Sequence, residues 1–145
     1  MEHLNVFSLI LATLTPTVMG FLYYSKWLFG KAWMQSIGMT EEKQKEANMP
    51  VVISISLVMA FLLSFFMVGF CNDVGQEGQF DTFKHGAWHG AFLSVFVIIP
   101  VLVTNGLFEQ RSWKNMLINS LYWLITLALM GGIIDAMNHF PNVVE

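Results

Sequence analysis

The residues best suited to chemistry are two pairs with the same spacing, each placed where an apolar stretch meets polar sequence. His85 and His89 are four residues apart, and so are Asp135 and His139. In an α-helix this spacing puts both members of a pair on one face, one turn apart. Imidazoles and carboxylates arranged in this way bind divalent metal ions in helical proteins, and histidine pairs also ligate haem. These four residues are therefore a candidate metal site, with haem ranked below a metal ion.

A purely structural interpretation of the same residues competes with the metal site, and the sequence favours it. Both pairs lie at ends of predicted helices, where water or lipid headgroups can solvate them. Gly86 and Gly90 beside the histidines, with Gly131 and Gly132 on the last helix, predict close helix packing. The sequence has no C-x-x-C-H or H-E-x-x-H motif. Because no nucleophile is paired with a base, we do not expect an enzyme.

Four uncharged, apolar stretches must position these residues. The chain has 145 residues, of which 12% are charged, about half the fraction in a typical soluble domain. The stretches cover approximately residues 4–25, 49–71, 86–108 and 115–134. Each is long enough to cross a hydrocarbon core of roughly 30 Å as a helix. We predict one all-α domain over residues 1–145, a four-helix transmembrane bundle of antiparallel hairpins. The first helix is expected to be retained, because no basic segment or cleavage site of a signal peptide accompanies it.

Prolines and aromatic residues add detail to this bundle. Pro16 and Pro100 lie inside the first and third helices, where proline removes a backbone hydrogen bond, so a kink is expected at each. Threonine hydroxyls near Pro16 are expected to satisfy the loosened backbone. Residues 28–37 carry apolar residues at four-residue spacing and are predicted to form a short interfacial helix. Aromatic side chains expected to anchor the protein at the membrane interface are Tyr23, Tyr24, Trp27, Trp33 and Trp113.

The distribution of basic residues predicts the orientation in the membrane. The connection between the second and third helices has only Lys84. Six basic residues lie in the other two connections: Lys26, Lys31, Lys43, Lys45, Arg111 and Lys114. Because Lys and Arg concentrate on the cytoplasmic side, we expect both termini outside. An unprocessed chain with short loops also predicts a location in a bacterial inner membrane. All four histidines then belong to the outer side. The net charge of −3 and the lack of a basic run exclude nucleic acid as an expected partner.

Three motifs of the chain occur together in a known family. They are the aromatic exit of the first helix (YYSKWLFGKAW), the T-N-x-L-F-E turn at residues 104–109, and the Y-W-L and M-G-G pattern of the last helix. With these motifs the chain resembles the uncharacterised family named domain of unknown function 1761, over most of its length. The resemblance implies a small bacterial membrane protein with four helices. It implies no activity, cofactor or catalytic residue.

Three hypotheses about function follow from these observations. The leading one is a structural or accessory membrane protein that associates by helix packing, either with itself or with a larger membrane complex. The second is a metal-binding, or less favoured haem-binding, protein that uses the histidines on its outer face. The third is a small transporter or channel in which Pro16 and Pro100 mark broken helices. The predicted hydrocarbon spans contain no charged residue, which argues against ion coupling. Asn105 is expected to be buried and to bond across helices.

Overall fold

The computed structural model describes residues 4–71 and 81–138, and only the backbone of Glu41. Within these ranges every regular element is helical. Helices long and apolar enough to cross a membrane are α1 (Val6–Tyr23), α4 (Met49–Phe70), the continuous run Phe83–Phe108, and α7 (Trp113–Met137). The run Phe83–Phe108 consists of α5 (Phe83–Leu93), a π-helical turn (Ser94–Ile98) and α6 (Ile99–Phe108). The structure therefore confirms the predicted all-α class with four such helices.

Each of the four long helices begins at a polar side chain that caps it. The side chains of Asn5, Asn48, Thr82 and Ser112 accept hydrogen bonds from backbone N–H groups in the first turns of α1, α4, α5 and α7. Such caps satisfy donors that have no partner within the helix. In α4, Pro50 is the second residue of the helix and lies in its first turn, where its missing N–H costs no hydrogen bond. The helix starts are thus encoded locally.

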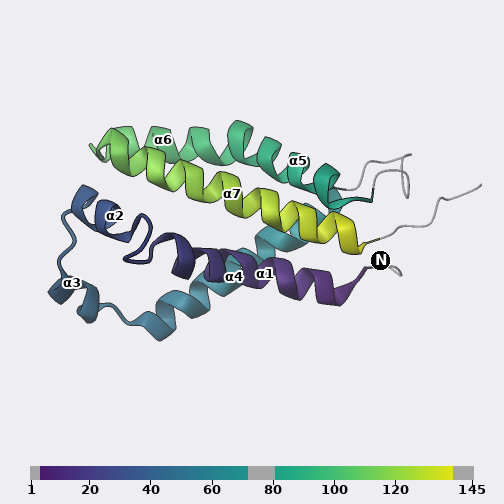
Figure 1. The fold of residues 1–145 in the computed structure, drawn as a ribbon, viewed down its shortest axis with the longest axis horizontal. Coiled ribbons are helices and arrows are strands. Elements are labelled where there is room, and N and C mark those ends of the chain that lie inside the picture. Colours follow the sequence, from purple (N-terminus) through teal and green to yellow (C-terminus); the bar gives the residue numbers. More distant parts are fainter. Residues whose placement is uncertain (1–3, 72–80, 139–145) are drawn as a thin grey trace, which may run out of the picture.

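Helix α7 is the centre of the arrangement. Figure 1 shows α5 and α6 along one side of α7 and α1 along another, with α4 crossing behind α1. Of the four long helices, α7 is the most buried, whereas α4 and the run Phe83–Phe108 are largely exposed. An apolar helix that exposes most of its surface is suited to contact lipid. Two short helices, α2 (Gly30–Ser36) and α3 (Glu41–Glu46), lie between α1 and α4 at one end of the molecule.

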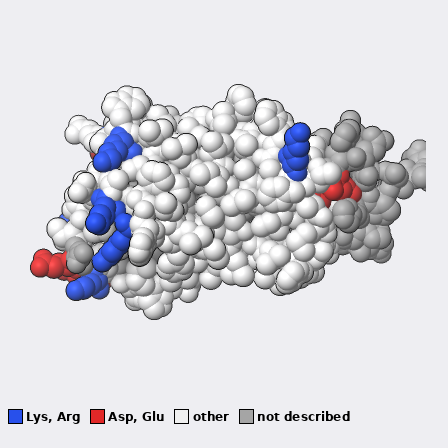
Figure 2. Space-filling view, viewed as in Figure 1, with Lys and Arg blue, Asp and Glu red and all other residues white. Residues whose placement is uncertain are grey.

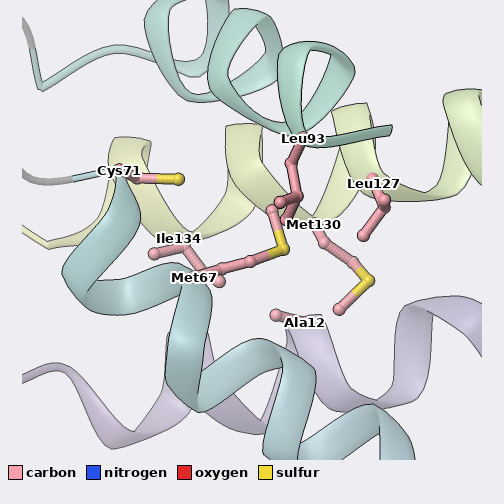
Figure 3. Packing of buried hydrophobic residues seen from close by; sticks show 7 residues of the cluster. All are labelled: Ala12, Met67, Cys71, Leu93, Leu127, Met130 and Ile134. Atoms are coloured by element: carbon pink, nitrogen blue, oxygen red, sulfur yellow. The ribbon is translucent and has the colours of Figure 1, made fainter. Parts of the chain in front are cut away.

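The main apolar core forms where the four long helices meet. Figure 3 shows side chains from α1, α4, α5 and α7 converging, together with Cys71 just after α4. Several of them are completely inaccessible to solvent, including Met67, Leu127 and Met130. The core members are Ala12, Met67, Cys71, Leu93, Leu127, Met130 and Ile134. This cluster ties the exposed helix α4 to the rest of the bundle.

The two internal prolines sit in different local structures. Helix α1 continues through Pro16, and the hydroxyls of Thr13 and Thr15 donate to the carbonyl oxygens of Leu9 and Leu11. Pro16 leaves the carbonyl oxygen of Ala12 without its usual donor. The two threonine hydroxyls do not bond to that oxygen, because they bond to Leu9 and Leu11 instead. Pro100 lies in the first turn of α6, directly after the π-helical turn. Single π-helical turns of this kind hold one extra residue inside an α-helix.

Basic residues gather at one end of the molecule. Figure 2 shows most of the visible Lys and Arg side chains at the end that carries α2, α3 and the α6–α7 turn. Lys84 belongs to the first turn of α5, which starts at the other end (Figure 1). Among the aromatic residues predicted as interfacial anchors, Trp27 and Trp113 are highly exposed. Tyr23 is buried in a small cluster with Ile118 and Tyr122, and Tyr24 and Trp33 pack against this cluster. Only part of the predicted aromatic belt therefore faces outward.

Candidate functional site

Three of the four candidate metal-site residues lie together, at the end of the bundle opposite the one where most basic residues gather. Nδ1 of His85 lies 3.0 Å from Oδ2 of Asp135, which joins α5 to α7. Nε2 of His85 lies 3.2 Å from Nε2 of His89 on the same face of α5. His139 lies outside the described residues. The i, i+4 pair of histidines therefore forms a chain of polar contacts with a carboxylate from the neighbouring helix.

Glycines let α5 and α7 approach closely enough to form this contact. A Cβ atom on Gly86 would overlap the carbonyl oxygen of Gly131 and the side chain of Asp135. A Cβ atom on Gly90 would overlap the carbonyl oxygen of Leu127. Small residues allow helix backbones to meet in this way in membrane proteins. The helix crossing thus places the Asp135 carboxylate against His85.

Gly132, the fourth glycine predicted to pack helices, meets an aromatic ring. A Cβ atom there would lie 2.6 Å from the Phe83 ring at the start of α5. Gly86, Gly90, Gly131 and Gly132 all therefore contribute to packing within the chain. The predicted approach points are occupied by the protein's own helices.

Each ring of the histidine pair also has a partner at its other nitrogen. Nδ1 of His89 lies 3.2 Å from the carbonyl oxygen of Phe70, the last residue of α4. The carboxylate that faces His85 also accepts from the backbone N–H of Thr82, at 3.3 Å. Asp135 itself is only 4% exposed. The site is therefore held by α4, α5 and α7 together.

The row of contacts from Asp135 through His85 and His89 to Phe70 has one hydrogen too few when the carboxylate is ionised and both rings are neutral. All three contacts become attractive only when one proton or a metal ion is added. A carbonyl oxygen can only accept, so Nδ1 of His89 carries a hydrogen toward Phe70. Facing an ionised Asp135, Nδ1 of His85 carries one as well. In neutral rings both Nε2 atoms then present lone pairs to each other. A metal ion or one extra proton between the Nε2 atoms converts this repulsion into attraction. If Asp135 carries the extra proton instead, the number of protons that must be added is still one.

The spacing of the two Nε2 atoms suits metal coordination. With metal–nitrogen bonds of about 2.1 Å, a separation of 3.2 Å corresponds to an angle of roughly 100° at the metal. That angle lies between octahedral and tetrahedral geometry. The described residues contain no group of three or more His, Cys, Asp and Glu side chains arranged for a metal. Asp135 faces Nδ1 of His85, on the side of the ring away from the Nε2 pair. It is therefore positioned to orient the His85 ring as a metal ligand.

A second polar site lies at the basic end, where α2 meets α7. The hydroxyl of Tyr24 donates to Oδ1 of Asn119 at 2.9 Å, and Nδ2 of Asn119 donates to Oδ1 of Asn115 at 3.2 Å. Nδ2 of Asn115 donates to the hydroxyl of Ser36, which in turn donates to the carbonyl oxygen of Trp33. The network fastens α2 to the central helix.

This network could have been found in the sequence as a polar stripe. Asn115, Asn119, Tyr122 and Thr126 recur at spacings of four, three and four residues, which places them on one face of the last helix. The hydroxyl of Tyr122 donates to the carbonyl oxygen of Pro16 at 2.7 Å, so the stripe faces α1 as well as α2. The sequence analysis missed it, because it considered the last helix only at its ends and for its glycines.

The comparison with known proteins covers almost the whole chain. A family model described as "protein of unknown function (DUF1761)" matches residues 7–134. The chain belongs to the DUF1761 family. The resemblance seen in the three motifs is thereby confirmed. The part matched by the DUF1761 model includes both histidines and ends one residue before Asp135. No curated protein and no solved structure matches this DUF1761 chain.

Proposed function

We propose that this protein binds a divalent transition-metal ion between the Nε2 atoms of His85 and His89. The observation that carries the proposal is the mutual orientation of the rings, whose Nε2 atoms face each other at 3.2 Å. A histidine that binds a metal through one nitrogen usually donates from the other to a carboxylate or a backbone carbonyl. His85 has Asp135 as this partner, and His89 has the carbonyl oxygen of Phe70.

The ligand type narrows the choice of metal. Neutral imidazole suits Zn, Cu, Ni and Fe, whereas Mg and Ca prefer oxygen ligands. The two histidines supply two coordination positions, which leaves the others to water or to a further ligand group. Haem is less suitable, because two axial histidines must bind from opposite faces of the porphyrin. In our proposed orientation the site faces outward from a bacterial inner membrane, since the basic connections lie at the other end.

Metal uptake by the purified protein tests the proposal. The chain would be extracted in mild detergent, stripped with a chelator, and titrated with Co²⁺, whose visible spectrum reports its ligands. We expect one Co²⁺ per chain in the wild type, and loss of that binding in His85→Ala and in His89→Ala. Trp88→Phe, on the exposed side of the same helix, is a matched control that should keep the metal. A wild-type protein that takes up no Co²⁺, Zn²⁺, Ni²⁺ or Cu²⁺ would refute the proposal.

A second candidate function is that of an accessory subunit that associates by helix packing with itself or with a larger membrane complex. It is supported by the outer face of α4, where Phe61, Leu62, Phe65 and Phe66 are about half exposed. The glycines of the α5–α7 crossing do not contribute to such a surface, because they are used within the chain. The native mass of the gently extracted particle tests this role. A particle containing only one copy of the chain would argue against it.

A further inference from the structure

A cavity lies at the basic end of the bundle, far from the histidine pair. Its volume is ≈ 310 Å³, which is the size of a small ligand site. It is open to the surroundings on one side and is lined by residues of α2, α6, the α6–α7 turn and the start of α7. The residues that line it are Trp33, Ile37, Leu102, Asn105, Gly106, Glu109, Arg111, Asn115, Met116 and Asn119.

Two opposite charges stand together on the wall of this cavity. Nε of Arg111 lies 3.0 Å from Oε2 of Glu109, and both side chains are partly exposed. Backbone geometry supports their position, because Gln110 between them has a positive φ of 56° and the N–H of Arg111 bonds to the carbonyl oxygen of Gly106. A guanidinium has five N–H donors and uses only its Nε–H toward Glu109 in this pair. The wall therefore offers a cation and an anion side by side.

The inner wall adds neutral donors. Asn115 and Asn119 each donate from the amide nitrogen in one hydrogen bond of the network that fastens α2. An amide nitrogen carries two hydrogens, so each has the capacity to donate to a further acceptor. Asn105, which we expected to be buried, is exposed and lines the cavity instead. Three amides and a guanidinium around one space suit a ligand with several acceptor oxygens, such as a phosphate.

The position of the cavity indicates a lipid as the source of that phosphate. It lies at the end of the apolar helices, where basic side chains gather and where Trp113 and Phe108 are highly exposed. This is the level at which headgroups surround a membrane protein. Leu102 and Ile37 give the cavity an apolar side that can accept the glycerol region of a lipid.

We propose that this cavity binds the phosphoethanolamine headgroup of a phospholipid. Arg111 and the amides donate to the phosphate, and Glu109 accepts from the primary ammonium. A headgroup with both charges matches the adjacent Arg111–Glu109 pair better than an anionic headgroup, which would meet the carboxylate. Phosphatidylcholine has the same charges, but its ammonium has no N–H to donate. The site is independent of the histidine pair.

Lipid retention by the full-length protein tests the proposal. The wild type would be delipidated in detergent and incubated with phosphatidylethanolamine, phosphatidylcholine or phosphatidylglycerol of identical acyl chains, and bound lipid counted by native mass spectrometry. We expect phosphatidylethanolamine to be retained about tenfold or more over phosphatidylcholine, the ratio expected for one hydrogen bond between charged groups. Equal retention of these two lipids, or stronger retention of phosphatidylglycerol, would overturn the proposal. This comparison uses the wild type and needs no variant to fold.

Two substitutions then assign the contacts. Glu109→Gln should reduce the retention of phosphatidylethanolamine toward the level of phosphatidylcholine, because the neutral amide oxygen no longer offers the ammonium a charge-assisted hydrogen bond. Arg111→Gln should weaken the retention of both lipids by a similar factor, because both have a phosphate. Lys43→Gln, an exposed change on α3 at the same end, is the control and should alter neither. Retention of the ethanolamine preference in Glu109→Gln would overturn the assignment of the headgroup.

Discussion

Oδ2 of Asp135 lies 3.0 Å from Nδ1 of His85, although 50 residues separate the two along the chain. The carboxylate is almost fully buried and makes a second hydrogen bond, to the N–H of Thr82. It therefore orients one ring of the proposed metal site without binding the metal itself.

Asp135→Asn should weaken metal binding without abolishing it. The variant keeps the size of the side chain but removes the charge that supports the His85 ring, and changes of this kind reduce metal affinity by about 10–100-fold. Isothermal titration with Co²⁺ measures the difference. Glu46→Gln, an exposed change on α3, is the control and should leave the affinity unchanged. An Asp135→Asn protein with wild-type affinity would contradict the role assigned to the carboxylate.

Gly90→Ala should destabilise the bundle. The added Cβ would overlap the carbonyl oxygen of Leu127, so α5 and α7 must separate. Overpacking of this kind costs about 1–3 kcal/mol. The midpoint of denaturation in detergent is the measurement. Gly69→Ala is a matched control, since a Cβ at that position has no atom within 4 Å and alanine favours a helix. Equal midpoints for the two variants would show that the close crossing is not required.

Tyr122→Phe should lower the stability by about 1 kcal/mol. The variant removes the 2.7 Å hydrogen bond to the carbonyl oxygen of Pro16 and leaves the aromatic packing with Tyr23 and Tyr24 in place. The free energy of unfolding, measured by titration with a denaturing detergent, is compared with the wild type. An unchanged value would mean that the Pro16 carbonyl finds another donor.

Asn115→Leu should release α2 while leaving the four long helices intact. The variant removes the hydrogen bond of Asn115 with Ser36, which joins α2 to α7, and its hydrogen bond with Asn119 within α7. Hydrogen exchange followed by mass spectrometry should show faster exchange in residues 30–36 and unchanged exchange in α4. Gln35→Ala, an exposed change within α2, is the control. Unchanged exchange in α2 would show that apolar contacts of Trp33 alone hold it.

A reporter fused after Glu145 should lie outside the cytoplasm, whereas one inserted in the connection that contains α3 should lie inside. The expectation follows from the basic residues that gather at the end of the molecule carrying α2 and α3. Paired alkaline phosphatase and fluorescent protein fusions provide the readout. The opposite pattern would reverse the membrane orientation and place the histidine pair on the cytoplasmic side.

The helices were predictable because their signal is local. Long uncharged stretches bounded by capping residues such as Asn5 and Ser112 indicate helices without reference to the rest of the chain. Residues 28–37 were predicted as an interfacial helix, and α2 covers Gly30–Ser36. Its start is shifted to Gly30, because residues 24–29 form turns in which the N–H groups of Phe29 and Gly30 bond to the carbonyl oxygens of Tyr23 and Ser25.

The sites depend on which helix faces meet, and the sequence determines this less directly. The pairing of His85 and His89 follows from helical spacing, but the position of Asp135 behind His85 depends on the glycine crossing between α5 and α7. Asn105 was expected to be buried because an amide in an apolar helix usually bonds to a neighbour. The structure instead exposes it on a cavity that residues of α2 and the start of α7 also line.

The π-helical turn at Ser94–Ile98 makes the third span sensitive to its exact length. One extra residue in a helix rotates everything beyond it by about 100° relative to an uninterrupted α-helix. On one side of the turn Gly90 meets α7 at Leu127, and on the other Gly106 meets α7 at Met116. Deleting a single residue from the turn would make the helix regular. Only one of the two contacts, either that of Gly90 or that of Gly106, could then still face α7. Relatives of this protein that lack the extra residue should therefore keep either the histidine site or the cavity at the basic end, but not both in this arrangement.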